Sequence, residues 1–511
     1  MGGLEKEIIN KKISRREALS MAGKVAIGAV VAGVVAGIGG YYAGATTVPP
    51  SVKTETVTRT VTSTQTVTVT AGVVSTPKPT ITAITTPTTV TTPTTTVYTP
   101  TKKYAGETIV FTYVDAAFTN PIPDVLPKFV EETGIKVVTQ RFSASALIAK
   151  ELADFRAKTG SHDVVVNHVS NAALLMSEGF LEPLDEYIEK DKDEIAFNDI
   201  PESSILFRWP WPAGKIYSLP IHAGSPPTLG VNRKHLEEVG LETKVPDTYD
   251  EWKEYAEALT KKPERYGACP FAGAGGELHT VVALTYQTIK GFGGEIIIPA
   301  GDNKWKVVVN SKEVIEALKF YKEMGDKYGP EGWTGLTLSE QILLYTQGKL
   351  STLITFADYW SKAVQVAGLE TIFGYIPAGK GGHQAVYINW EIGIPADSKH
   401  KEAAWELVKF LLRKDIHRYL VEKGCGAVRF SEFNDPELLK TRPFYKVMSE
   451  TFAKGYTFGL PMIIPWGDIT VKVIGPILSG YYAGQYSAEE AVSKMETMIK
   501  DILRDNKLLA E

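Results

Sequence analysis

Hydrophobic residues after position 103 alternate between continuous runs and helical spacing. Apolar runs predict strands, and apolar residues three and four positions apart predict amphipathic helices. The predicted elements are a strand over 107–114, a helix over 123–133, a strand over 135–142, a helix over 144–158 and a strand over 163–169. Strands that alternate with helices of this length form βαβ units around a mostly parallel sheet. The pattern therefore predicts an α/β fold.

Polar residues directly follow the first and third of these strands. Ligands of open α/β sheets bind beyond the carboxyl ends of the strands, so the loop 115–120 and the segment 167–171 are candidate contacts. Within them, Asp115, His168 and Asn171 carry side chains that can bond a ligand. A simpler interpretation is also open, because Asp115 and Asn171 can each cap the helix that follows.

A basic tip and an uncharged apolar segment precede this region. The tip, residues 1–24, includes Arg15 and Arg16, and the 21 residues 25–45 carry no charge. At about 1.5 Å per residue the uncharged segment spans roughly 30 Å, the thickness of a bilayer core, and its basic flank orients the tip inside. We expect a retained transmembrane anchor. The alternative is a cleaved signal, because 14–19 (SRREAL) resembles a twin-arginine export signal and 43–45 (AGA) fits a signal peptidase site.

Threonine and proline dominate the segment 46–103. Between Thr46 and Thr101 there are 25 threonines and 7 prolines. Such tracts cannot build a core, and they often carry O-linked sugars. At about 3.1 Å per residue an extended tract of this length reaches on the order of 150 Å. We expect a disordered stalk that holds a domain at the cell surface, outside a membrane.

The overall composition excludes several functions. The formal net charge is −4 and no basic stripe is present, so nucleic acid is not an expected partner. No Gly-x-Ser-x-Gly, His-Glu-x-x-His or phosphate-loop motif occurs, and the 8 histidines are scattered. We therefore expect neither an enzyme nor a bound metal or cofactor. The two cysteines, Cys269 and Cys425, form either a disulfide or two buried thiols.

Seven short sequence passages, each present once, follow one another along 105–505. They are 131–137 (EETGIKV), 179–187 (GFLEPLDEY), 214–220 (GKIYSLP), 230–234 (GVNRK), 245–252 (VPDTYDEW), 402–411 (EAAWELVKFL) and 484–491 (GQYSAEEA). Together they resemble the passages of extracellular solute-binding proteins of family 1, the maltose-binding type. One departure is Gly230, because the family commonly has a tyrosine there.

The resemblance implies a periplasmic-binding-protein-like fold of type II, in which two α/β lobes close on a ligand like a hinged clamp. By position, the first lobe comprises 104–227 and 371–424, and the second comprises 228–370 and 427–511. The resemblance also implies the substrate-binding subunit of an ABC importer, which delivers its ligand to a permease in the membrane. A stalk without a lipidation cysteine favours an archaeal source.

The ligand class depends on the residues of the implied cleft. Sugars present hydroxyl groups and a flat apolar face, so their sites combine carboxylates or amides with aromatic rings. In the family, the segments that match Tyr359, Trp360, Trp390 and Trp466 face the cleft. The complete expected contact set is Asp115, His168, Asn171, His222, Asp358, Tyr359, Trp360, Trp390, Glu391 and Trp466.

Several of these residues have a second interpretation. Asp358 and Glu391 are alternatively surface charges, and His222 alternatively holds a loop. Six further tryptophans lie outside the contact set, and the pattern around four of them suggests a role. Trp252 and Trp405 lie in helical patterns and are expected in the core, whereas Trp209 and Trp211, between prolines, either contact the ligand or plug a loop.

The expected function is capture of a sugar or oligosaccharide for an importer. One alternative is another small solute, such as a polyamine, an organic anion or a metal ion. A second alternative is a secreted glycoside hydrolase with Asp358 and Glu391 as its carboxylate pair.

Overall fold

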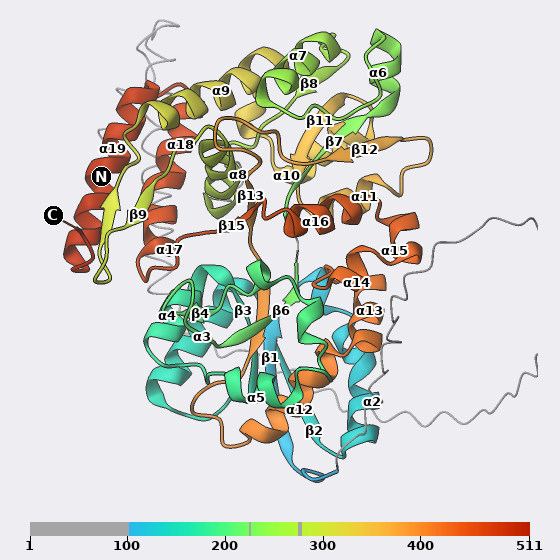
Figure 1. Ribbon diagram of the computed structural model, residues 1–511, viewed down its shortest axis with the longest axis vertical. Coiled ribbons are helices and arrows are strands. Elements are labelled where there is room, and N and C mark those ends of the chain that lie inside the picture. The colour runs from blue at the N-terminus through green and yellow to red at the C-terminus, as the bar shows by residue number, and fades with distance from the viewer. Residues whose placement is uncertain (1–101, 224–225, 274–277, 511) are drawn as a thin grey trace, which may run out of the picture. The chain divides into compact units, whose positions relative to one another are not determined.

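The computed structural model describes residues 102–223, 226–273 and 278–510 of the 511-residue chain. The predicted anchor, and the predicted stalk up to residue 101, lie outside these ranges. Within them, no helix is both long and apolar enough to cross a membrane. The described region is an α/β fold with two larger sheets, each the centre of one lobe (Figure 1).

The first lobe is built on a five-stranded sheet. In spatial order its strands are β2 (Lys136–Phe142), β1 (Thr108–Val114), β3 (Val164–His168), β14 (Trp390–Gly393) and β6 (Ser218–His222). β1 pairs in parallel with β2 and β3, whereas β14 is antiparallel to both β3 and β6. All strands except β14 therefore run in one direction, as the alternation of strands and helices predicts, and their carboxyl ends share one edge.

Three helices pack on this sheet: α2 (Ile122–Thr133), α3 (Ala144–Ala157) and α12 (Lys401–Leu412). Gly134 ends α2 in a left-handed conformation that glycine adopts without strain. In α12, Trp405 is 1% exposed and its indole N–H donates to Asp191 at 2.7 Å. The prediction that Trp405 is a core residue is therefore confirmed.

The second lobe is built on a four-stranded sheet. In spatial order its strands are β12 (Thr371–Gly374), β7 (Thr228–Asn232), β11 (Leu350–Thr355) and β8 (Tyr266–Ala268). Helices α7 (Tyr249–Leu259) and α9 (Lys312–Tyr328) pack on this sheet. Trp252 of α7 is 3% exposed and donates to Thr352 Oγ1 at 2.8 Å, which confirms its predicted place in the core.

The position of β12 corrects one sequence-based boundary. The first lobe is expected to resume at residue 371, but Thr371–Gly374 pairs with β7 of the second sheet. The first sheet resumes only at β14. A short strand carries no signal of the sheet it joins, because pairing depends on distant residues. The expected boundary at residue 371 is therefore wrong, and the second sheet extends past it.

The chain passes between the two sheets after β6, after β12 and after α13 (Lys414–Glu422). In the segments that connect the two sheets, β13 (Ala385–Tyr387) pairs in parallel with β15 (Thr457–Gly459). Two short hairpins are also present, β4 (Arg208–Trp209) with β5 (Lys215–Ile216) and β9 (Ile297–Pro299) with β10 (Trp305–Val307).

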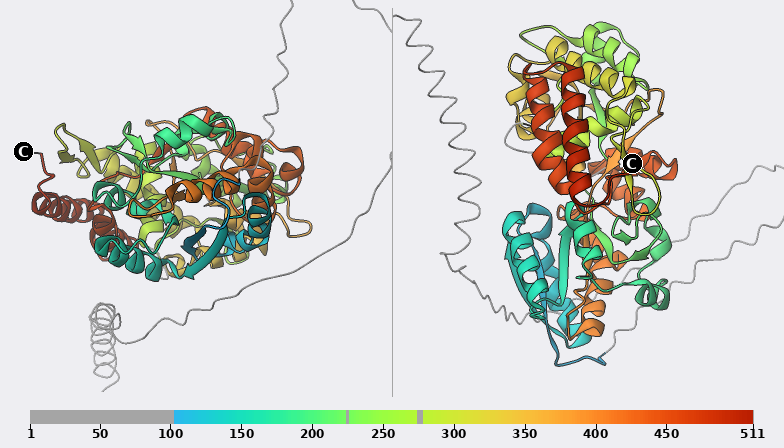
Figure 2. Two further views of the ribbon diagram at one scale, coloured as in Figure 1. Left: turned by 90° about the horizontal axis from the view of Figure 1, so that it is seen from below. Right: turned by 90° about the vertical axis from the view of Figure 1, so that its left-hand side faces the viewer.

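The remaining helices connect and cover these strands, and α18 and α19 pack side by side (Figure 2). Their bounds are α4 (Ala172–Ser177), α5 (Asp185–Asp191), α6 (Arg233–Val239), α8 (Leu278–Gly291), α10 (Leu338–Thr346), α11 (Ala357–Ala363), α14 (Phe430–Phe433), α15 (Pro436–Thr441), α16 (Phe444–Ala453), α17 (Trp466–Asp468), α18 (Gly475–Tyr482) and α19 (Ala488–Asp505).

The two cysteines are free and buried. Cys269 and Cys425 belong to separate hydrophobic clusters, and the Cys425 thiol donates to the carbonyl of Ile221 at 3.1 Å. Of the two interpretations of the sequence, the pair of buried thiols is therefore the one observed, and the disulfide is wrong.

Candidate ligand-binding site

Three neighbouring strands of the first sheet bring predicted contact residues to one edge. His168 is the last residue of β3, His222 is the last residue of β6, and Trp390 is the first residue of β14. Because β14 runs antiparallel between the other two strands, Trp390 pairs with both His168 and His222. The sheet therefore places these three side chains next to one another where the parallel strands end.

Aromatic contacts join these residues to Phe118. Phe118 lies in the short helix Ala117–Thr119 after β1, and its ring stacks on His222 with centroids 3.8 Å apart and planes 12° apart. The Trp390 centroid lies 5.6 Å from Phe118 and 5.0 Å from His168. We call Phe118, His168, His222 and Trp390 the edge cluster. Trp390, Phe118 and His168 are each half-buried, so the cluster keeps ring surface accessible.

His168 is a neutral hydrogen-bond donor. Its Nδ1 accepts from the backbone N–H of Ser170 at 3.3 Å and lies 2.9 Å from Ser170 Oγ. Burial, together with the nearby His279 and His222, lowers the pKa of His168 to about 3. The imidazole therefore carries no charge near neutral pH. Because Nδ1 accepts, the ring hydrogen is on Nε2.

His222 links the edge cluster to the second lobe. Its Nδ1 accepts from the backbone N–H of Gly426 at 2.7 Å, which leaves Nε2 as the donor in the neutral ring. Nε2 lies 3.5 Å from Oδ2 of Asp358, a residue of α11. The Asp358 side chain is half exposed, so its carboxylate also has room for a ligand.

His279 approaches from the second lobe, in the first turn of α8. It is close enough to His168 for the charge of one ring to lower the pKa of the other. His279 is exposed to solvent, yet surrounding protein lowers its own pKa through desolvation. His279 therefore places a second-lobe side chain near His168.

Two further predicted residues lie near the carboxyl ends of the first sheet. Asn171 occupies the N-cap position of α4, but its side chain makes no capping bond, and its Nδ2 is buried without a partner among the described residues. The capping interpretation of Asn171 is therefore wrong. Asp115 is exposed and accepts from Arg141, which also donates to Asn120 Oδ1 at 2.7 Å.

Trp360 is not a ligand contact, and this prediction is wrong. Its side chain is 0% exposed and packs edge-on against Tyr345 and Phe373, with centroids 5.1 Å away in both cases. A Cβ added to Gly230 would lie 2.3 Å from the Trp360 ring. Glycine at position 230, where the family commonly has tyrosine, thus makes room for this indole. Tyr359, the neighbour of Trp360, is half-buried and has Lys362 Nζ 5.2 Å from its ring centroid.

Glu391 is also wrongly predicted as a contact, and the surface alternative is wrong too. Its side chain is 0% exposed and accepts from the backbone N–H of Leu206 at 2.7 Å and from Asn389 Nδ2 at 2.8 Å. Burial raises the pKa of this carboxyl to about 8. Glu391 therefore ties the segment before β4 to β14, beneath the edge cluster.

Trp466 is close to the site but largely covered. It is 4% exposed, and its ring centroid lies 6.2 Å from that of Tyr286. A Cβ on the next residue, Gly467, would lie 3.8 Å from the carbonyl oxygen of Ser170 in the first lobe. The Trp466 indole nitrogen is buried and has no partner in the described part of the chain. Its ring faces are thus unavailable for stacking, while its N–H is unused.

Sequence reasoning missed Phe118 and His279. Phe118 lies within the loop 115–120 that we expect at the site, and an aromatic residue there was the available signal. His279 belongs to no recognisable motif, so only the fold could bring it near His168. Within the described ranges, no group of three or more His, Cys, Asp or Glu side chains is arranged to hold a metal ion.

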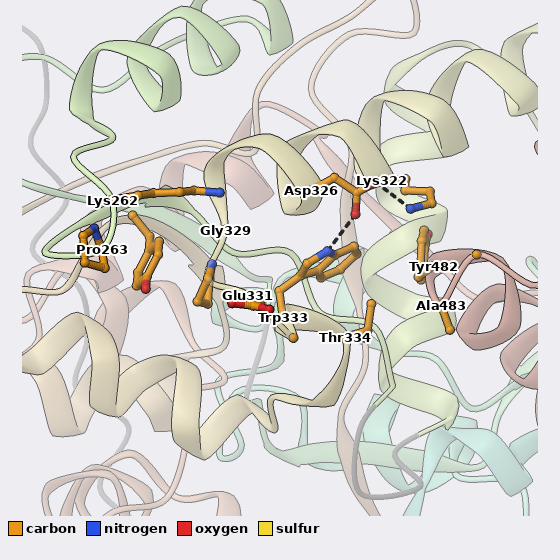
Figure 3. A pocket seen from close by; sticks show the side chains of 14 residues that line it. Lys262, Pro263, Lys322, Asp326, Gly329, Glu331, Trp333, Thr334, Tyr482 and Ala483 are labelled. Carbon is orange, nitrogen blue, oxygen red and sulfur yellow. Dashed lines mark hydrogen bonds and ion pairs between the residues drawn. The ribbon is translucent and has the colours of Figure 1, made fainter. Parts of the chain in front are cut away.

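A separate hollow of about 640 Å³ contains Trp333 (Figure 3). The Trp333 indole nitrogen donates to Asp326 at 3.0 Å, and the ring covers Gly325, where a Cβ would lie 2.2 Å away. The lining residues lie within 262–266, 322–334 and 482–484. None comes from the first sheet or its helices, so this hollow cannot be a site that the two lobes share.

Comparisons with known proteins identify a family. The family described as bacterial extracellular solute-binding protein matches residues 110–417. A binding protein of Brucella abortus (strain 2308) is 27% identical over 318 residues, which cover 61% of this chain and 73% of that protein. A mannitol-binding protein of Pseudomonas aeruginosa is 23% identical over 377 residues, which cover 66% and 80%.

A solved structure shares the fold. The ABC transporter solute-binding protein of Agrobacterium radiobacter K84, in complex with ribitol, superimposes with a TM-score of 0.66 at 23% identity, covering 78% of this chain and 99% of that one. This likeness shows an α/β periplasmic-binding-protein fold. Because the family match spans more than half of its length, the chain belongs to the bacterial extracellular solute-binding proteins, which bind solutes rather than catalyse reactions.

Proposed function

We propose that this protein is the substrate-binding subunit of an ABC importer and that it captures a neutral sugar or polyol between its lobes. The observation that carries the proposal is the edge cluster facing Asp358. It combines a half-buried indole, Trp390, with the uncharged imidazole of His168. Such a set offers an apolar face and directional donors, which hydroxyl-rich ligands need.

Charged ligands fit this set less well. An organic anion would meet the Asp358 carboxylate without a facing cation in the edge cluster. A polyamine carries several charges and needs several carboxylates, whereas the Asp358 carboxylate already lies near His222. A metal ion would need a ligand group of a kind that the described residues do not form. A neutral hydroxylated molecule meets no charge repulsion from Asp358, and it needs neither several carboxylates nor a set of metal ligands.

The relatives support the same ligand class. The similar protein of Pseudomonas aeruginosa binds mannitol, and the similar structure from Agrobacterium radiobacter contains ribitol. Both molecules are uncharged and carry a hydroxyl group on every carbon. We extend this ligand class to the present chain because its edge cluster has matching chemistry.

The proposed mechanism is ligand-dependent closure of a hinged clamp. His168, Asn171 and Trp390 belong to the first lobe, while Asp358 and His279 lie on the second. A ligand bonded to both sets stabilises the closed arrangement by the difference between its affinities for the two states. The closed form then presents its surface to a membrane permease. Retention of 25–45 as an anchor, with the stalk as a spacer, would keep the protein at the cell surface beside that permease.

A calorimetric titration of the full-length protein tests the proposal. The panel consists of maltose, mannitol and ribitol, with spermidine, citrate and zinc as the charged alternatives. We expect at least one of the three neutral compounds to bind and none of the charged compounds to compete with it. Binding of a charged compound alone would overturn the proposed ligand class.

A further inference from the structure

A second recess lies away from the edge cluster, and we call it the aromatic pocket. Its volume is about 690 Å³. Its walls are the β4–β5 hairpin at 209–212, the β9–β10 hairpin at 299–305 and the segment 458–462, together with Tyr286 and Lys290 of α8. Figure 1 labels β4, β9 and β15, the strands to which these three segments belong or are joined. The pocket is thus shared by residues before β6, residues of the second lobe and a strand that lies on the passages between them.

Five aromatic rings line the pocket, namely Trp209, Trp211, Tyr286, Trp305 and Phe458. All except Tyr286 are half-buried, so each presents part of its ring to the recess. The Trp211 ring rests beside Gly459, where a Cβ would lie 3.4 Å from it. Tyr286 and Phe458 meet edge-on with centroids 5.3 Å apart. These rings provide flat apolar surfaces on more than one wall.

The charges of the lining cancel. Lys290 and Lys304 are opposed by Glu295 and Asp302. Lys290 pairs with Glu295 at 2.7 Å, Tyr286 donates its hydroxyl to the same carboxylate, and Lys304 donates to the carbonyl of Lys507 at 2.7 Å. A charged ligand would gain no net attraction from this lining. A neutral ligand with hydroxyl groups can bond to the polar rim without displacing an ion pair.

We propose that the aromatic pocket is a second saccharide-binding site that takes neutral sugar rings. Its volume is within the range of small-molecule sites, and aromatic walls with a few polar groups are the composition that stacked sugar rings need. The proposal rests on these residues alone and does not depend on the proposed function of the edge cluster. It resolves the two interpretations of Trp209 and Trp211 in favour of ligand contact, at a place other than the edge cluster.

The two sites are separate but joined by one helix. No edge-cluster residue lines the aromatic pocket. His279 lies at the start of α8 and Lys290 near its end, and at about 1.5 Å per residue their separation along the helix is roughly 16 Å. The Tyr286 ring, in the pocket, lies 6.2 Å from that of Trp466. Helix α8 therefore carries residues near both sites.

Fluorine NMR of the full chain tests the proposal. The 9 tryptophans are replaced by 5-fluorotryptophan, and each resonance is assigned by a single Trp→Phe substitution. Maltotriose, cellotriose and mannotriose are titrated into a variant that carries Asp358→Ala and Trp390→Ala, which disables the edge cluster. We expect the resonances of Trp211 and Trp305 to shift saturably with at least one trisaccharide, while those of Trp252 and Trp405 stay fixed.

Two variants separate direct contact from secondary effects. Trp211→Ala with Trp305→Ala should abolish the saturable binding. Asn303→Ala, at an exposed position on the same rim, should weaken it about fivefold without touching the packed rings. Thermal melts of both variants establish whether each is folded. If the double tryptophan variant does not fold, the affinity of the Asn303→Ala variant alone tests the proposal.

Three results would overturn the proposal. The first is that none of the trisaccharides shifts Trp211 or Trp305. The second is that these resonances shift only when the edge cluster is intact, because lobe closure would then explain the change. The third is unchanged affinity in the Asn303→Ala and tryptophan variants. A shift of Trp390 alone in the unmodified protein would leave the proposed function standing and reject the second site.

Discussion

His222 Nε2 lies 3.5 Å from a carboxylate oxygen of Asp358, and these two residues come from different lobes of the protein, His222 from β6 and Asp358 from α11. The bond between Gly426 N–H and His222 Nδ1 fixes the imidazole so that its remaining donor is the one near Asp358. The pair therefore spans the junction of the lobes at the edge of the first sheet, beside Trp390. This arrangement makes Asp358 the most direct test of the proposed site.

Replacing Asp358 by Asn should weaken binding of the neutral ligand about ten- to hundredfold. A hydrogen bond to a charged group contributes about 1.5–3 kcal/mol, and this is the change expected when the carboxylate becomes an amide. The melting temperature should change little, because the side chain is half exposed. Calorimetric titration and thermal melts measure the two effects.

Asp501→Asn is the matched control for this substitution. Asp501 is a comparably exposed carboxylate, paired with Arg504 on α19. The same chemical change there should leave affinity unaltered. Equal affinities for the Asp358 variant and the unmodified protein would remove Asp358 from the site.

Trp390→Ala and Trp360→Ala should have opposite consequences. Trp390 is half-buried in the edge cluster, and the loss of some tens of Å² of apolar contact with a sugar costs about 1–3 kcal/mol of binding free energy. Trp360 is fully buried, so its removal should lower the free energy of unfolding by about 3–5 kcal/mol. Urea titrations and ligand titrations of both variants separate the roles. If Trp360→Ala remains as stable as the unmodified protein, the packing described for the second lobe is wrong.

Glu391→Gln should make stability less dependent on pH. Burial raises the pKa of Glu391 from about 4.5 in the unfolded chain to about 8, so the folded state binds the proton more tightly. Its contribution to stability is fully present below pH 4.5 and is lost as the pH rises through 8. Glutamine is neutral at every pH and can accept the same bonds from Leu206 and Asn389. Denaturant unfolding at pH 5 and pH 9 should show a smaller difference for the variant, and an equal difference would contradict the assignment.

The fragment 104–511 should be soluble and folded without the leader. The described region has its own cores in both lobes, and Trp252 and Trp405 lie in two of them. A single cooperative transition, or two if the lobes unfold separately, should appear in thermal denaturation. Aggregation of the fragment under conditions in which the full chain is soluble in detergent would be evidence against a stalked domain.

The native protein should retain residues 25–45. Mass spectrometry of protein purified from its source reads the mature N-terminus directly. A mature chain that begins at Thr46 or Thr47 would demonstrate a cleaved export signal, because position 45 ends the small-residue motif. Attachment of the stalk to the membrane would then require another explanation.

Local pattern predicted the elements of the first lobe well. β1 begins at Thr108 and α2 ends at Thr133, each within one residue of the sequence-based bound. These elements are recognisable because their burial follows short-range periodicity. His168 likewise lies where the pattern predicts it, at the carboxyl end of β3, whereas Trp390 was assigned to the cleft only by the family resemblance.

Tertiary packing determines the positions of the residues that local pattern assigns wrongly. Trp360 and Glu391 both sit next to residues of the site, and only their burial in the folded chain excludes them. Position in the chain cannot distinguish adjacent side chains that point to opposite sides of an element. The pairing of β12 is a similar case, because its partner β7 is more than a hundred residues earlier.

The packing of Trp360 against Gly230 determines how firmly the helix that carries Asp358 is held to the second sheet. The indole fills the space above β7 and donates to the Thr228 carbonyl at 3.4 Å. Asp358 lies two residues before Trp360 in the same helix, α11. Helix α11 is thereby packed onto the sheet of the second lobe, so we expect the backbone of Asp358 to move together with that lobe. In the proposed clamp, a change in the separation between Asp358 and His222 would therefore report movement of the second lobe as a whole rather than of one side chain.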